Sequence, residues 1–105
     1  MNSISVQELL EWKEAGKDFQ LIDIREKDET DICSIDGEHI PMAEIAQHPE
    51  KIARNKKVVI HCRTGGRSSK TIRFLEAEYG IENLYNLDGG IIAWIEEVDN
   101  SLIAY

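Results

Sequence analysis

The first half of the chain alternates short apolar segments with polar ones. Residues 5–8, Ser-Val-Gln-Glu, form a capping-box pattern followed by apolar residues at helical spacing, which predicts a helix that ends near Gly16. Residues 19–24 are mainly apolar and predict a buried strand. The acid-rich residues 26–38 predict a loop with a short helical turn. A brief helix is predicted between the prolines at positions 41 and 49.

The second half contains the clearest unit of the pattern. Residues 58–61, Val-Val-Ile-His, predict a short strand that leads into a glycine-containing loop. A helix capped by Ser68 or Ser69 is expected to follow and to stop at Gly80. Its predicted apolar face consists of three residues at helical spacing, Ile72, Leu75 and Tyr79. A further strand is predicted at residues 83–87, and a last helix from 91 to about 98.

The order of these elements predicts the fold class. Strands that alternate with helices form a mostly parallel sheet covered on both faces, so we expect an α/β protein. At 105 residues the chain is expected to be one domain, residues 1–105, that folds without disulfides or metals. No apolar run approaches the roughly 20 residues of a membrane span, and the first five residues are not a signal peptide. We therefore expect a cytoplasmic protein with no membrane partner.

The charge of the chain is unevenly distributed. The net charge of −8 argues against nucleic acid as a partner. Residues 1–50 hold thirteen acidic and four basic residues, and residues 76–105 hold seven acidic residues and no Lys or Arg. Residues 51–75, in contrast, hold eight basic residues and no acid. If these eight also lie together in space, their field would attract a small anion and stabilise a thiolate.

Only two cysteines are present, Cys33 and Cys62. They form no CxxC pair and no Cys/His cluster with zinc spacing, so neither a metal site nor a cofactor is expected. Cys33 lies near apolar residues and is interpreted as a small core residue, with a role as resolving cysteine for Cys62 as the less favoured alternative. His61 is interpreted as a packing residue, because neighbouring side chains of a strand face opposite sides.

Cys62 stands where reactivity is expected. It follows the strand predicted at 58–61 and opens the loop 62–67, Cys-Arg-Thr-Gly-Gly-Arg, ahead of a helix. Ligands of α/β folds bind at the carboxyl ends of strands, and loop N–H groups together with a helix N-terminus hold anions. Gly65 and Gly66 lack the Cβ atoms that would oppose a tight curl. These features predict a thiolate with a lowered pKa, and the alternative is a buried structural cysteine beside a glycine turn.

Three segments of the chain resemble one enzyme family. Residues 62–68, Cys-Arg-Thr-Gly-Gly-Arg-Ser, resemble the active-site loop of the rhodanese family of sulfurtransferases. Residues 21–26, Leu-Ile-Asp-Ile-Arg-Glu, resemble the first signature of that family, and residues 86–94, Asn-Leu-Asp-Gly-Gly-Ile-Ile-Ala-Trp, resemble its C-terminal one. The resemblance spans nearly the whole chain. It implies a single rhodanese-like domain with a central, mostly parallel sheet of about five strands and helices on both faces.

The same resemblance implies roles for individual residues. Cys62 would carry sulfur as a persulfide, with no metal involved. The loop would bind the anionic substrate through Arg63, Thr64, Gly65, Gly66, Arg67 and Ser68. Arg63 would guide an anionic donor, and Arg67 would either close the loop or bind the same anion. Asp23 and Arg25 are interpreted as structural residues near the site.

The length of the loop distinguishes two chemistries that this fold supports. The related phosphatases have arginine six positions after the nucleophile, whereas here Ser68 stands at that position and Arg67 comes at five. The shorter loop makes a smaller cradle, suited to sulfur and too tight for tetrahedral phosphate. This disfavours a phosphatase or arsenate reductase. The presence of Cys62 disfavours a second alternative, a non-catalytic rhodanese-like binding module.

The implied reaction is a double displacement, a form of covalent catalysis. The Cys62 thiolate would attack the outer sulfur of a donor, which is thiosulfate or the persulfide of another protein. An acceptor nucleophile would then remove that sulfur from Cys62.

The tail indicates which acceptor to expect. Residues 94–105, with Ile32-Cys33, resemble parts of the rhodanese domains fused behind adenylyltransferases of molybdopterin and thiamine biosynthesis. That resemblance implies a partner adenylyltransferase and, as acceptor, a small sulfur-carrier protein ending in Gly-Gly. No adenylyltransferase portion is present in the sequence, so an excised domain or a free-standing relative is expected.

Overall fold

The computed structural model describes residues 1–105 and contains one five-stranded sheet in which every strand pairing is parallel. Its strands are β1 (Asn2–Ile4), β2 (Phe19–Asp23), β3 (Glu38–His39), β4 (Lys57–His61) and β5 (Leu84–Leu87). The spatial order is β1-β5-β4-β2-β3, which places β4 in the centre. The predicted mostly parallel sheet of about five strands is confirmed.

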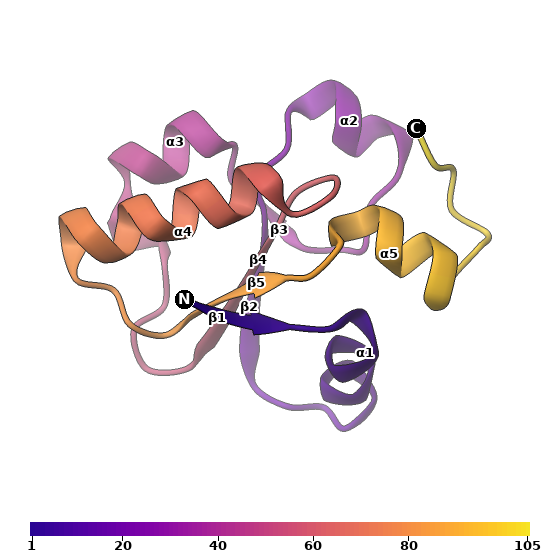
Figure 1. Ribbon diagram of the computed structural model, residues 1–105, viewed down its shortest axis with the longest axis horizontal. Coiled ribbons are helices and arrows are strands. Elements are labelled where there is room, and N and C mark those ends of the chain that lie inside the picture. Colours follow the sequence, from indigo (N-terminus) through magenta and orange to yellow (C-terminus); the bar gives the residue numbers. More distant parts are fainter.

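Helices cover both faces of this sheet (Figure 1). They are α1 (Val6–Glu14), α2 (Lys27–Ile32), α3 (Met42–Gln47), α4 (Gly66–Tyr79) and α5 (Gly90–Glu97), with a 3-10 turn η1 (Pro49–Lys51). Figure 1 shows α3 and α4 together on one side and α1 and α5 on the other, while α2 lies close to the end of the chain. The α/β class with two covered faces is therefore as predicted. None of these helices is both long and apolar enough to cross a bilayer.

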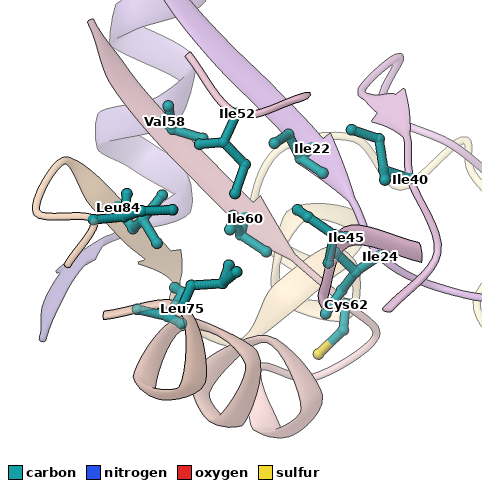
Figure 2. Packing of buried hydrophobic residues seen from close by; sticks show 12 residues of the cluster. Ile22, Ile24, Ile40, Ile45, Ile52, Val58, Ile60, Cys62, Leu75 and Leu84 are labelled. Atoms are coloured by element: carbon teal, nitrogen blue, oxygen red, sulfur yellow. The ribbon is translucent and has the colours of Figure 1, made fainter. Parts of the chain in front are cut away.

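The sheet separates two hydrophobic clusters. The alternation of strand side chains sends Val58 and Ile60 of β4 to one face and Val59 to the other. The first cluster, drawn in Figure 2, lies under α3 and α4 and includes Cys62 at its edge, beside the ribbon of α4. The second lies under α1 and α5 and includes Cys33. The two cysteines therefore belong to clusters on opposite faces of the sheet.

Local signals in the sequence account for the start of α1 and the end of α4. Ser5 caps α1 in the predicted capping box, because its hydroxyl accepts the N–H of Glu8 while the Glu8 carboxylate accepts the N–H of Ser5. Gly80, in the left-handed region, ends α4 as predicted.

Three sequence predictions are corrected. Helix α4 is not capped by Ser68 or Ser69 but begins at Gly66, with the left-handed Gly65 as its first flanking residue. Tyr79 is 40% exposed and is not buried with Ile72 and Leu75, and its hydroxyl donates to the carbonyl of Ala46. Strands β1 and β3 were not predicted, since their few residues become strands only by pairing with β5 and β2 respectively.

Candidate active site

The Cys62 sulfur lies inside a ring of hydrogen-bond donors. The end of β4 leads directly to Cys62, and the chain turns back into α4 within the next four residues. The N–H of Gly65 donates to Sγ at 3.1 Å and the N–H of Ser68 at 3.4 Å, while the Ser68 hydroxyl lies 3.4 Å from the same sulfur. The loop thus forms the small anion cradle that the glycine pattern predicted.

This ring of donors favours the thiolate. Burial raises the pKa of the Cys62 thiol, which is only 1% exposed. The Ser68 hydroxyl and three backbone N–H groups lower the pKa by more, so that it lies below its ordinary value. The N–H groups belong to Ser68, Gly65 and Thr64. A lowered pKa raises the fraction of Cys62 that is present as the thiolate, the nucleophilic form of the sulfur.

Asn86 of β5 supports the loop from the neighbouring strand. Its side-chain oxygen accepts a hydrogen bond from the Ser68 hydroxyl, and its amide lies 3.4 Å from the carbonyl of Gly65. The Ser68 hydroxyl has one proton, for which the carbonyl of Gly65, the Asn86 oxygen and the Cys62 sulfur compete. When Cys62 is a thiolate, the proton can turn toward sulfur and stabilise the charge. Sequence reasoning placed Asn86 in a family signature without giving it this role.

The backbone conformation requires a glycine at only one of the two glycine positions of the loop. Gly65 has a φ of +107°, a conformation that side chains with a Cβ rarely adopt. Gly66 has no positive φ, and a Cβ there would meet no atom within 4 Å. The expectation that Gly66 is needed for the tight curl is therefore wrong.

The N-terminus of α5 holds the other side of the loop. The N–H of Ile91 donates to the carbonyl of Cys62, and that of Ile92 donates to the carbonyl of Arg63, both at 3.1 Å. Gly90 permits this approach, because its φ is +59° and an added Cβ would lie 2.4 Å from the carbonyl oxygen of Arg63. The Gly-Gly pair ahead of the last helix was the sequence signal for this contact.

Arg67 is engaged by a carboxylate. Its guanidinium forms two parallel hydrogen bonds with Glu29 of α2, Nη1 to Oε1 at 2.7 Å and Nη2 to Oε2 at 2.8 Å. The Arg67 guanidinium is the main cause that lowers the pKa of Glu29 to about 2. Of the two roles considered for Arg67, this geometry favours closing the loop, since the arginine ties the loop to α2.

Arg63 faces the tail of the chain. Its guanidinium carbon lies 5.0 Å from the centre of the Tyr105 ring, and its Nη2 donates to the backbone carbonyl oxygen of Tyr105. The Tyr105 hydroxyl accepts from Arg25 at 2.9 Å and donates to Glu29 at 2.7 Å. Tyr105 therefore contacts groups from three parts of the site, and the sequence pattern assigned it no role.

Asp23 and Arg25 form a buried ion pair behind the loop. Arg25 Nη2 donates to Oδ2 of Asp23 at 2.7 Å, its Nε donates to Oδ1 at 3.0 Å and to Oδ2 at 3.2 Å, and Asp23 also accepts the backbone N–H of Arg25. Burial raises the pKa of Asp23, but the hydrogen bonds and charge of Arg25 keep it below its usual range. The fully buried Arg25 also donates to the carbonyl of Cys33 at 2.8 Å. The pair thus joins the end of β2 to the segment after α2 and lies outside the cradle.

His61 is fully buried on the strand that leads to the site. Its Nε2 lies 3.6 Å from Asp23 Oδ2 and has no hydrogen-bond partner, while Nδ1 lies 3.2 Å from the carbonyl of Cys62. Burial lowers the pKa of His61, which favours the neutral ring. No three His, Cys, Asp or Glu side chains are grouped as they would be around a metal ion.

The basic stretch of the sequence does not gather at the loop as a whole. Lys56 and Lys57 lie at the amino end of β4, roughly 15 Å along the strand from Cys62. Lys51 and Lys56 pair with acids, Glu44 and Asp18 respectively. The loop itself contains two of the basic residues, Arg63 and Arg67, and the second of these is already paired.

A cysteine at the end of the central strand, in a cradle of N–H groups, is the arrangement found in α/β enzymes with a loop-bound nucleophile. The family model described as "Rhodanese-like domain" matches residues 5–97, and the chain therefore belongs to the rhodanese family.

Individual relatives agree with this assignment. The protein named "Sulfurtransferase" from Allochromatium vinosum is 35% identical over 95 residues, covering 90% of this chain and 88% of its own. MoeZ of Mycobacterium tuberculosis, named as an adenylyltransferase/sulfurtransferase, is 29% identical over 107 residues. The match to MoeZ covers 99% of this chain, which spans only 27% of the length of MoeZ.

Solved structures share the fold. The rhodanese-like domain protein of Staphylococcus aureus superposes with a TM-score of 0.81 at 30% identity, covering 100% of this chain and 99% of its own. A yeast protein tyrosine phosphatase of the rhodanese family also superposes, with a TM-score of 0.70 and 22% identity over 96% of this chain and 90% of its own. At 22% identity, the likeness to the yeast phosphatase concerns the fold alone.

Proposed function

We propose that this chain is a sulfurtransferase that carries sulfane sulfur on Cys62 as a persulfide. The observation that carries the proposal is the ring of donors around Sγ, with N–H groups at 3.1 and 3.4 Å and a hydroxyl at 3.4 Å. These donors stabilise a thiolate, and they would equally stabilise the anionic outer sulfur of a persulfide. Sulfurtransferase activity is also what the names of the relatives MoeZ and the Allochromatium vinosum protein state for those proteins.

The reaction proceeds in two displacements. The Cys62 thiolate attacks the outer sulfur of the donor, so that a new S–S bond forms while the bond between that sulfur and the rest of the donor breaks with its electron pair. With thiosulfate the leaving group is sulfite, and with a persulfide it is a thiolate. An acceptor nucleophile then attacks the outer sulfur, and Cys62 leaves as a thiolate. Arg67, held by Glu29, keeps the loop closed around the sulfur in both steps.

The acceptor we propose is a small sulfur-carrier protein ending in Gly-Gly, in the cytoplasm. The support for this is the resemblance of the tail to domains fused behind adenylyltransferases and the name of MoeZ. With this acceptor the terminal sulfur of the Cys62 persulfide is itself the nucleophile: it attacks the carbonyl carbon of the carrier glycine, which a partner adenylyltransferase has adenylated, and AMP leaves. A thiol reductant then cleaves the acyl disulfide that joins the carrier to Cys62, which releases the carrier thiocarboxylate and the Cys62 thiolate while the reductant is oxidised to a disulfide.

The phosphatase alternative rests on the fold shared with the yeast phosphatase, and the loop argues against it. Arg67 follows Cys62 by five positions, and its guanidinium pairs with Glu29 instead of facing the cradle as a free phosphate ligand.

Mass spectrometry of the intact protein tests the proposal. After incubation with thiosulfate or cysteine persulfide, we expect a mass gain of one sulfur atom that cyanide removes. Cys62→Ser should abolish this gain, whereas the matched variant Cys33→Ser should retain it. A wild-type protein that gains no sulfur from either donor, or that hydrolyses an aryl phosphate, would contradict the proposal.

A further inference from the structure

Both cationic side chains of the loop are occupied in the structure. Arg67 is bound by the two carboxylate oxygens of Glu29. Arg63 lies against the ring of Tyr105 and donates to its backbone carbonyl oxygen. An oxyanion that approached Cys62 would therefore find no free guanidinium beside the cradle.

Hydrogen bonds and apolar contacts hold Tyr105 in its position against Arg63. Its hydroxyl accepts from Arg25, which is fully buried and paired with Asp23, and donates to Glu29. The Tyr105 side chain and Leu102 also pack against the second hydrophobic cluster. The tail is thus tied to the same residues that fix Arg67, because Glu29 accepts from Arg67 and Tyr105 together.

Thiosulfate and persulfide donors differ in whether they need a free cationic side chain beside Cys62. Thiosulfate is a small dianion whose sulfonate leaves as sulfite, so its binding depends on a cation that offers charge-assisted hydrogen bonds. A persulfide presents a sulfur attached to another sulfur and has no oxyanion next to the transferred atom. Its reaction with Cys62 depends on the N–H cradle and needs no free arginine.

We propose that Tyr105 determines the class of sulfur donor: by engaging Arg63 it disfavours small oxyanionic donors such as thiosulfate and leaves Cys62 to persulfide donors. This inference rests on the proposed sulfurtransferase function and specifies its donor. Thiosulfate must displace Tyr105 from Arg63 before it binds, and that competition raises its KM. The kcat changes little, because Tyr105 touches neither the sulfur nor the donors that surround it.

Steady-state kinetics with one acceptor, cyanide, and two donors, thiosulfate and cysteine persulfide, test the proposal. In Tyr105→Ala the tail loses the hydroxyl and the ring that anchor it, and Arg63 becomes free. We expect the KM for thiosulfate to fall about tenfold, the size expected for one charge-assisted hydrogen bond, while the KM for cysteine persulfide changes less than about twofold. Tyr105→Phe, which keeps the ring and loses the hydroxyl, should change in the same direction by a smaller factor.

Ile103→Ala is the matched control, because Ile103 belongs to the same tail and is 67% exposed. It should leave both KM values at the wild-type level. An unchanged thiosulfate KM in Tyr105→Ala, or an equal change for both donors, would overturn the role of Tyr105 while leaving the sulfurtransferase proposal intact. Should Tyr105→Ala fail to fold, Tyr105→Leu, which keeps apolar packing and removes both the hydroxyl and the aromatic ring, decides in the same way. Absence of turnover with both donors in the wild-type protein would instead refute the function itself.

Discussion

The chemistry of single residues at this site depends on how one proton is shared. Ser68 lies within hydrogen-bond distance of the Cys62 sulfur and of Asn86, and its hydroxyl can donate to only one of them at a time. A thiolate attracts that proton more strongly than a neutral amide oxygen does. Ser68 therefore stabilises the charged state of the nucleophile selectively, and a selective contact of this kind lowers a pKa.

The reactivity of Cys62 toward iodoacetamide should follow this pKa. Because burial raises the pKa of Cys62 and the hydrogen bonds from Ser68 and the loop lower it by more, the alkylation rate should rise with pH through a midpoint below that of a free cysteine. Ser68→Ala removes the hydroxyl donor and should move the midpoint to higher pH. Peptide mass spectrometry distinguishes Cys62 from Cys33, whose alkylation serves as the internal control. A midpoint that Ser68→Ala leaves unchanged would contradict the role given to the hydroxyl.

At the level of elements, the loop is held between two helices. Helix α4 supplies the N–H of Ser68 to the sulfur, while the first turn of α5 donates to the carbonyls of Cys62 and Arg63. The peptide unit between Arg63 and Thr64 thus accepts a hydrogen bond from α5 through its carbonyl, while its N–H is one of the groups that lower the pKa of Cys62. Contacts within the chain therefore hold the loop N–H groups toward Sγ, so the cradle is preorganised.

Gly90→Ala should damage this junction. Its φ of +59° is strained for alanine, and the new Cβ would lie 2.4 Å from the carbonyl oxygen of Arg63. We expect the free energy of unfolding in urea to fall by about 2 kcal/mol or more, and persulfide formation to slow. Gly66→Ala is the matched control at the start of α4, where a Cβ meets no atom within 4 Å, and it should change the free energy by less than about 1 kcal/mol. Equal losses of unfolding free energy in the two variants would contradict the role of Gly90 in the contact between α5 and the loop.

At the scale of the whole molecule, the central sheet joins the two hydrophobic clusters into one structure. Strand β4 contributes Val58 and Ile60 to the first cluster and Val59 to the second. A loss of packing on either face therefore disturbs the strand that leads to Cys62. A single domain of this size, with both faces sharing the same strands, is expected to unfold in one transition.

Substitutions on opposite faces test that coupling. Leu9 lies in the second cluster and Leu75 in the first, and both are fully buried. Leu9→Ala and Leu75→Ala should each reduce the free energy of unfolding by about 2–5 kcal/mol. Trp12 and Trp94 both lie on the face of the second cluster, so their fluorescence reports that face directly. The fluorescence and circular dichroism midpoints should nevertheless shift together in Leu75→Ala, and separate midpoints would indicate independent units.

Features that depend on neighbours along the chain could be predicted from the sequence. The capping box at Ser5, the strand before Cys62, the parallel α/β class and the position of the cysteine in a glycine-containing loop all follow from patterns a few residues long. Hydrophobic periodicity and helix capping are local, so a single sequence contains them. The family resemblance added the sulfur chemistry, which remains a proposal for this chain.

Contacts between residues far apart in the sequence were decided only by the tertiary structure. Arg67 and Glu29 are 38 positions apart, Arg63 and Tyr105 are 42, and Tyr105 and Glu29 are 76. Nothing in the local pattern pairs such residues, because their partners are chosen by the packing of α2, the loop and the tail around the sheet. The sequence by itself determined that Cys62 has a cradle. The fold decided that the arginines beside it are already engaged, and this decides which anion can approach the sulfur.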